Sequence, residues 1–194
     1  GGDSVECRLI EIRHEELEET VLAELRELDA SLLILPRHRG VKNTSSEFAL
    51  QRHLFAHASC ATVQLSPGDQ DAADCDRILV PTRGSRNTVD AIRLATDLAE
   101  SEGGIVTALF VQPDVDIAAA EVGRRTIERL VHRYADDTEQ RVATESVVCD
   151  DVARGILQYA PGQSDLIILG ASYHTVVHRL LFSSIAEEVI HAED

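Results

Sequence analysis

The chain has 194 residues, 44% of them hydrophobic and 27% charged, which is enough to bury one large core or two small ones. Its 34 acidic residues outnumber 18 basic ones, and the net charge of −16 disfavours binding to nucleic-acid phosphates or anionic lipids. No run of about 18 apolar residues occurs, so the sequence predicts no transmembrane helix. We expect a cytoplasmic chain with no nucleic-acid partner.

The cysteines and the first residues bear on where the chain comes from. The four cysteines form no C-x-x-C pair, a pattern typical of reduced thiols in a cytosolic protein. The sequence contains no methionine and begins with Gly1 and Gly2, from which we expect a piece of a longer polypeptide.

The first 65 residues alternate strand and helix signals. Short apolar runs predict strands at Val5–Ile12, Ser31–Leu35 and Ala61–Leu65, and helical periodicity predicts helices at Glu15–Leu28 and Glu47–His57. The apolar face of the first helix consists of Leu17, Val21, Leu22, Leu25 and Leu28.

After the Pro-, Gly- and Asp-rich linker Ser66–Asp76, the chain alternates strands and helices in the order βαβαβαβα. The predicted strands are Arg77–Pro81, Ile105–Val111, Val142–Val148 and Asp165–Leu169. The first predicted helix begins near Asn87 and ends at Gly103; the second follows Pro113; the third begins at Asp150 or Asp151 and ends at Pro161; the fourth is Thr175–His191. The inward positions of the first two helices are Val89, Ile92, Ala95, Leu98 and Ala99, and Val122, Ile127, Leu130, Val131 and Tyr134.

This alternation requires a mostly parallel sheet with right-handed crossovers and helices on both faces. Ile105–Val111 is almost continuously apolar, as a strand covered on both faces should be. Val142–Val148 alternates instead, which places it nearer the edge of the sheet.

An internal repeat links the two parts of the chain. Residues 32–35 and 166–169 read L-L-I-L and L-I-I-L, an offset of 134 residues, which is the size of one small α/β domain. The first part matches only the later elements of the second. We therefore expect a partial unit at residues 1–68 and a second unit at 75–194.

Two segments of the second unit resemble motifs of a known family. Asp76–Ser85 reads D-R-I-L-V-P-T-R-G-S and resembles the opening strand and loop of universal stress protein domains, commonly I-L-V-A-x-D-G-S. Leu166–Tyr173 and Leu180–Ile190 resemble their closing motif, which is G-x-x-G, nine residues, then G-[ST]. The resemblance covers about Cys75–Asp194, and Val5–Leu65 more faintly.

The resemblance implies a flavodoxin-like, adenine-nucleotide alpha-hydrolase-like fold. This is an open parallel five-stranded sheet of order 3-2-1-4-5, here in two tandem units with the first incomplete. The ligand implied is ATP or AMP, where one is bound, and none is required. A crevice opens where such a strand order reverses, and a glycine turn before a helix offers N–H groups to phosphates. The implied binding residues are Thr82, Arg83, Val111, Gly170, Ser172, Ser183 and Ser184.

The sequence departs from the family's binding pattern. Tyr173 and Ser183 replace the second and third glycines, and Arg83 replaces the acidic residue of the first loop. In the first unit Pro36, which has no N–H, stands where Gly170 stands in the second. These departures favour a structural role over nucleotide binding, although Arg83 could pair with another anion.

We expect a non-catalytic pair of universal-stress-type domains. The loop Thr82–Ser85 also resembles the version found behind amino-acid permeases and cation antiporters, which implies the cytosolic regulatory region of an inner-membrane transporter. The alternatives are a free-standing ATP- or AMP-binding stress protein and a slow ATP hydrolase. The expected partners are a second copy or an intramolecular pseudo-dimer, and the membrane part of its own polypeptide.

Two other patterns are weaker. Gly170–His174 lies where the nucleophile elbow of a hydrolase would lie, but its closing glycine is absent and too little sequence follows to supply the other catalytic residues. His53 and His57, like His174 and His178, are spaced i, i+4, but no third ligand accompanies either pair at metal-binding spacing. We expect solvated or capping histidines and no metal.

Overall fold

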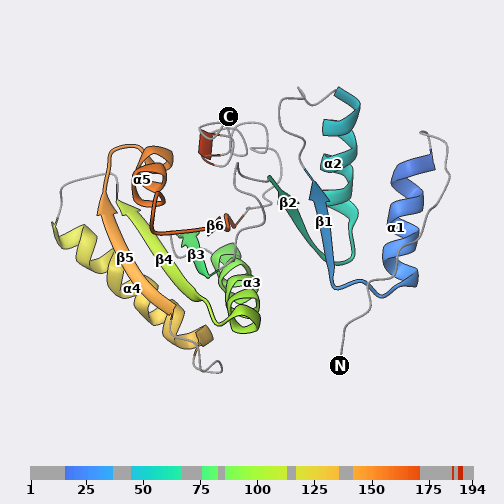
Figure 1. Ribbon diagram of the computed structural model, residues 1–194. Coiled ribbons are helices and arrows are strands. Elements are labelled where there is room, and N and C mark those ends of the chain that lie inside the picture. The colour runs from blue at the N-terminus through green and yellow to red at the C-terminus, as the bar shows by residue number, and fades with distance from the viewer. Residues whose placement is uncertain are drawn as a thin grey trace. The chain divides into compact units, whose positions relative to one another are not determined.

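The structure, a computed structural model, divides into two compact units, Gly1–Pro67 (unit 1) and Gly68–Asp194 (unit 2). Figure 1 shows the strands and helices of each unit. The residues that the structure describes are 16–36, 45–66, 76–82, 86–112, 117–135, 142–170, 185 and 188–189.

Unit 1 contains two strand–helix pairs close to the predicted positions. Its elements are α1 (Leu17–Glu27), β1 (Leu32–Pro36), α2 (Ser45–His57) and β2 (Ala61–Leu65). The two strands pair in parallel. The predicted strand Val5–Ile12 lies outside the described residues.

The core of unit 1 lies between α1 and α2. Leu22, Leu25 and Leu54 are 8%, 8% and 1% exposed, and Leu33 and Leu35 of β1 pack against them. The prediction for Leu28 was wrong, since its side chain is 54% exposed. Leu28 is the C-cap residue of α1 and so lies past the last helical position.

Unit 2 follows the predicted order of strands and helices. Its elements are β3 (Arg77–Pro81), α3 (Arg86–Glu102), β4 (Ile105–Gln112), α4 (Ile117–Ala135), β5 (Val142–Val148), α5 (Val152–Tyr159) and β6 (Leu166–Ile167). The predicted final helix is described only at residues 185, 188 and 189. Among the described residues, every helix is too short or too polar to cross a bilayer.

The sheet of unit 2 is parallel and has the order β5-β4-β3-β6. Numbered within the unit, this is 3-2-1-4, which agrees with the first four strands of the predicted order; a fifth strand is not among the described residues of unit 2. The edge position predicted for Val142–Val148 is confirmed. β6 is shorter than the predicted Asp165–Leu169, because only Leu166 and Ile167 have ladder partners on β3.

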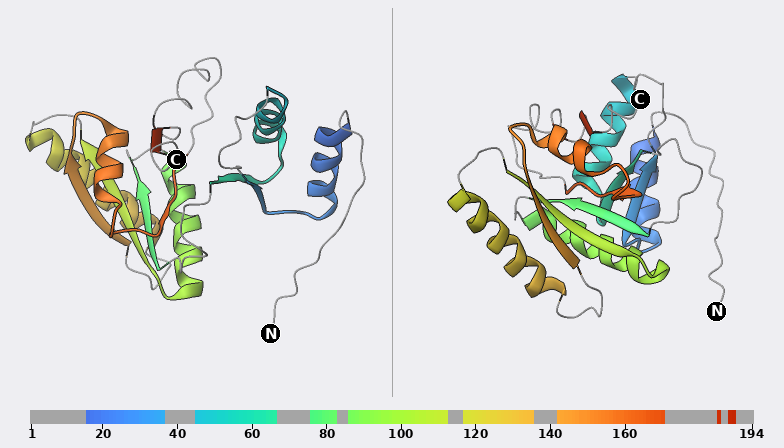
Figure 2. Two further views of the ribbon diagram at one scale, coloured as in Figure 1. Left: turned by 45° about the horizontal axis from the view of Figure 1, so that its top comes forward. Right: turned by 60° about the vertical axis from the view of Figure 1, so that its left-hand side comes forward.

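Helices cover both faces of this sheet, as the right-hand view of Figure 2 shows. One face packs on α3 and α4 through a cluster that includes Ile78, Ile92, Val106 and Ile127. The other face packs on α5, where Leu79, Leu109, Val111 and Ile156 are all 2% exposed or less. Two apolar layers therefore hold β3 and β4 at the centre of the unit.

Two apolar helix residues of unit 2 do not lie in the core, although the sequence predicted that they would. Leu98 is 38% exposed and Val122 is 66% exposed. At about 100° per residue, Leu98 lies about 120° round α3 from Ile92, and Val122 lies about 140° round α4 from Ile127. Small polar residues, Thr88 and Thr96, are buried on α3 instead. The buried face of each helix therefore differs from the face that its apolar residues alone predict.

Gly155 allows α5 to lie close against the sheet. A Cβ at this position would lie 2.6 Å from Val111 Cγ1 and 3.1 Å from Cys149 Cβ. We expect Gly155→Ala to lower the free energy of unfolding by about 2 kcal/mol, because a contact as short as 2.6 Å places the overpacking cost near the upper end of about 1–3 kcal/mol, while the gain in helix propensity is about 1 kcal/mol. Urea denaturation followed by circular dichroism measures the change. A variant as stable as the wild type would show that α5 is free to move away from β4.

Candidate functional site

The order of strands in unit 2 reverses at β3. The chain passes from β3 to β4 and β5 on one side and then returns to β6 on the other side of β3. The connections therefore diverge at the carboxyl ends of β3 and β6, where α/β sheets of this kind bind ligands. We call the residues that follow these two ends, Thr82 and Gly170, the switch-point edge.

Extended by three positions past its last ladder pair, the register of the two strands sets Thr82 opposite Gly170. The pairs Ile78↔Leu166 and Leu79↔Ile167 give an offset of 88 (166 − 78). The amide of Ile168 donates to Leu79 O at 2.9 Å, which extends the pairing by one step. The same offset carries Thr82 to Gly170.

The two residues of the switch-point edge differ in accessibility. Thr82 is 6% exposed, and its amide donates to Leu109 O at 2.8 Å, so that amide belongs to the sheet. Gly170 is exposed. Because glycine has no Cβ, its backbone can be approached closely by a ligand. Gly170 is the more open of the two positions.

Val111 also lies at the carboxyl edge of the sheet, near the end of β4. It is only 2% exposed and belongs to the cluster beneath α5. Its side chain therefore packs in the core beneath α5 and is not open to a ligand. The other predicted binding residues, Arg83, Ser172, Ser183 and Ser184, lie outside the described residues. The structure thus brings Thr82, Val111 and Gly170 to one edge.

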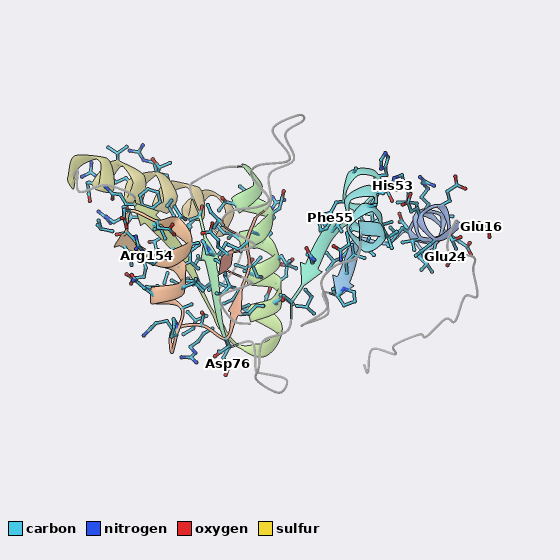
Figure 3. The ribbon with its side chains drawn as sticks, turned by 90° about the horizontal axis from the view of Figure 1, so that it is seen from above. Glu16, Glu24, His53, Phe55, Asp76 and Arg154 are labelled. Atoms are coloured by element: carbon cyan, nitrogen blue, oxygen red, sulfur yellow. The ribbon has the colours of Figure 1, made fainter. Side chains whose placement is uncertain are left out.

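An ion pair joins β3 to the turn before β6 at the opposite, amino-terminal end. Arg77 Nη2 donates to Asp165 Oδ1 at 2.6 Å, and Arg77 Nε donates to Asp165 Oδ2 at 3.2 Å. Arg77 Nη1 also donates to Gly162 O at 2.6 Å. The Arg77 side chain holds the pKa of Asp165 below its ordinary value, chiefly through these hydrogen bonds. Figure 3 labels the neighbouring Asp76, which marks this end of the sheet.

This ion pair predicts a loss of stability in acid. A carboxyl group whose pKa is lower in the folded chain stabilises the fold above its unfolded pKa of about 4, and that contribution is lost as the pH falls through the folded pKa. We expect the difference in unfolding free energy between the wild type and Asp165→Asn to shrink below about pH 4. Urea titrations between pH 3 and pH 6 measure it. A difference that stays constant across this range would contradict the role assigned to Asp165.

Other charged groups with shifted pKa values form ion pairs within helices or beside them. Arg154 lowers the pKa of Asp150 at the start of α5, mainly through a hydrogen bond. Arg124 lowers the pKa of Glu121 on α4 in the same way, with Arg125 contributing. None of these described groups follows β3 or β6, so none of them belongs to the switch-point edge.

The two histidines of unit 1, His53 and His57, lie among the described residues, and their rings contact each other. The rings of His53 and His57 stack with centroids 4.2 Å apart, and His57 Nδ1 lies 2.9 Å from His53 O. His53 Nδ1 is 3.4 Å from a carboxylate oxygen of Glu18 on the neighbouring α1, and Figure 3 shows His53 on that side of α2. Within the described residues, no three His, Cys, Asp or Glu side chains are placed to hold a metal ion.

Two open cavities of unit 2 flank α5. The larger, about 350 Å³, is lined by Asp151, Arg154, Leu157 and Glu188 among others, and the smaller, about 160 Å³, by Val148, Cys149, Gln158 and Tyr159 among others. Neither includes Thr82, Val111 or Gly170 in its lining, so neither coincides with the predicted binding site.

Comparison with known proteins identifies the family. The model of the universal stress protein family matches residues 75–192, more than half of the chain. The chain belongs to the universal stress protein family. No curated protein matched the sequence.

Solved universal stress proteins have a similar fold. One from Archaeoglobus fulgidus DSM 4304 is 17% identical, with a TM-score of 0.59, and the match covers 89% of this chain and 60% of that one. UspA from Lactobacillus plantarum is 23% identical over 62% of this chain and 93% of that one, with a TM-score of 0.49. The first of these likenesses supports a universal-stress-type α/β fold with parallel strands.

The structure adds two features that the sequence did not reveal. Gln112, at the end of β4, is a polar residue only 5% exposed. In the sequence, the burial of Gln112 was indicated only by its position as a polar residue at the end of an apolar strand. The pairing of Arg77 with Asp165 spans 88 positions of sequence and could be recognised only once the register of β3 and β6 was known.

Proposed function

We propose that this universal stress protein is a non-catalytic regulatory module that binds an adenine nucleotide at the switch-point edge of unit 2. The observation that carries the proposal is that Thr82 and Gly170 follow the carboxyl ends of two paired strands at the point where the strand order reverses. The backbone of an exposed glycine there is open to phosphate oxygens. The departures at Tyr173 and Ser183, which by themselves favour a structural role, lead us to propose weaker binding than a complete glycine motif would give.

The described residues of the predicted site support binding over catalysis. Thr82, Val111 and Gly170 are the described residues of the predicted site, and none of them can act as a general acid or base near neutral pH. The described carboxyl groups with lowered pKa values are paired with arginines elsewhere. We therefore propose that a bound nucleotide is held and not turned over.

Calorimetry and a phosphate-release assay test this proposal together. We expect saturable heat from ATP or AMP and no phosphate release above the uncatalysed rate. An absence of saturable binding up to millimolar ATP would overturn nucleotide binding and leave a structural role. Phosphate release abolished by Gly170→Asp would show instead that the chain is an enzyme.

Support for a tandem arrangement comes from the repeat. The offset of 134 residues carries α5 (Val152–Tyr159) onto residues 18–25, within α1, and carries β6 onto residues 32–33, within β1. The Archaeoglobus match covers 89% of this chain, which is more than unit 2 alone and so includes part of unit 1. We propose that unit 1 is a second, partial unit of the same type.

Two settings suit such a module: a free-standing stress-response protein in the cytoplasm, and the cytosolic region of a membrane transporter. The second setting rests on the resemblance of the sequence at Thr82–Ser85. Fractionation of producing cells distinguishes the two, since the chain would be found in the cytosol or with the inner membrane.

We also propose that the chain pairs, either between its two units or with a second copy. Sedimentation would separate a monomer from a dimer.

A further inference from the structure

Arg77 and Asp165 lie one position before the first ladder pair of β3 and β6, Ile78↔Leu166. The offset of 88 that relates these strands relates Arg77 to Asp165 as well. The amide of Asp165 donates to Arg77 O at 2.8 Å, and the amide of Arg77 donates to Asp165 Oδ2 at 3.1 Å. With the three guanidinium hydrogen bonds described above, these contacts form what we call the Arg77–Asp165 clamp.

The clamp lies on the two strands that carry the switch-point edge. Thr82 follows Arg77 by five positions, and Gly170 follows Asp165 by five positions. β6 has only two ladder residues on β3. Apart from the clamp, its register rests on the hydrogen bond from Ile168 to Leu79 and on the packing of residues 166–169 against the two buried clusters. A slip of one residue would turn every β6 side chain to the opposite face and move Gly170 off the level of Thr82.

We propose that the Arg77–Asp165 clamp is a positioning pair for the nucleotide site, because it sets the register that holds Gly170 level with Thr82. The proposal rests on the proposed function for its effect on the ligand, and on the strand geometry for its effect on register. Neither side chain of the clamp touches the ligand, since both lie at the amino ends of the strands. The clamp acts through the backbone of β3 and β6.

The guanidinium group is required for this geometry. Its fork donates from Nε and Nη2 to the two oxygens of Asp165, while Nη1 donates to Gly162 O in the turn. A lysine at this position would keep the charge but, as a point charge, could not donate in this fork arrangement. Arg77→Lys is therefore a mild variant, and Arg77→Gln a severe one.

The test measures two properties of each variant: the affinity for ATP by calorimetry, and the exchange rate of the Ile168 amide, which donates to Leu79 O. Arg124→Gln is the matched control. It removes exposed ion pairs with Glu121 and Glu128 on α4, and Arg124 is 42% exposed where Arg77 is 47% exposed. α4 carries no residue of the switch-point edge.

We expect Arg77→Gln to weaken ATP binding at least about fivefold, the low end of typical coupling between two sites, and to speed exchange of the Ile168 amide by a similar factor. Arg77→Lys should lie between Arg77→Gln and the wild type. Arg124→Gln should leave both properties unchanged.

Unchanged Ile168 exchange in a folded Arg77 variant would overturn the register claim. Faster exchange with unchanged ATP affinity would overturn the link to the ligand, as would an equal loss of affinity in Arg124→Gln. A wild-type chain that binds no ATP would refute the proposed function and its link to the clamp, and the Ile168 amide alone would then decide the register claim.

Discussion

Leu79→Ala should lower the free energy of unfolding of unit 2 by about 3 kcal/mol, the cost of a cavity left by a fully buried leucine. Leu79 is 0% exposed on the central strand β3 and belongs to the cluster beneath α5. It pairs with Ile167 of β6, so the cavity would open beside the short strand that leads to Gly170. Urea denaturation followed by circular dichroism measures the loss.

Leu98→Ala is the matched control, because it removes the same atoms from a leucine that is 38% exposed. We expect it to cost about 1 kcal/mol or less, since little buried apolar area is removed. Equal losses in the two variants would contradict the packing described here, in which Leu79 is in the core and Leu98 is at its margin.

Gly170→Asp should weaken ATP binding at least about tenfold, equivalent to about 1.4 kcal/mol. The substitution adds a Cβ where the backbone is open and places a carboxylate beside the phosphates, which it repels. Gly170 is exposed, so the fold should tolerate the change. Calorimetric titration with ATP measures the effect.

Gln158→Glu controls for the added negative charge. Gln158 is exposed on α5 and lines the two cavities, whose linings do not include Thr82 or Gly170. Its substitution should leave the affinity for ATP within about twofold of the wild type, because an exposed charge at a distance is largely screened by salt. If Gln158→Glu weakens binding as much as Gly170→Asp does, ATP binds beside α5 and not at the proposed edge.

The strand and helix pattern of unit 2 was predictable because its signals are local. Arg77–Pro81 is an apolar run followed by a turn, and Asp151 caps α5 by accepting from the Arg154 amide at 2.7 Å, one of the two caps that the sequence offered. The alternation at Val142–Val148 reflects an edge strand with one neighbour among the described residues. In each case a few adjacent residues carry the whole signal.

The errors arose where tertiary packing chose among similar local patterns. Leu98 and Val122 both fit an apolar helix face, but the sheet covers an arc of each helix that excludes them. For α3, buried Thr88 and Thr96 replace the expected leucine. The sequence of one helix does not reveal how much of the helix surface the neighbouring sheet covers.

The candidate site was predictable in location and not in detail. Gly170 and Thr82 were recognised from motifs at the ends of two strands, and the parallel sheet brings those ends to one edge. Their equal level, and the Arg77–Asp165 clamp, depend on the register of β3 against β6. Register depends on how two segments 88 positions apart pair, so the pattern within one segment does not reveal it.

Unit 2 is proposed to bind a nucleotide at the switch-point edge. Amide chemical shifts of the labelled chain, followed during titration with ATP, test it most directly. We predict that the signals of Thr82, Val111 and Gly170 move together along one binding curve, while those of Leu157 and Gln158 beside the cavities on α5 stay in place. Movement confined to α5, or no movement at millimolar ATP, would contradict the claim.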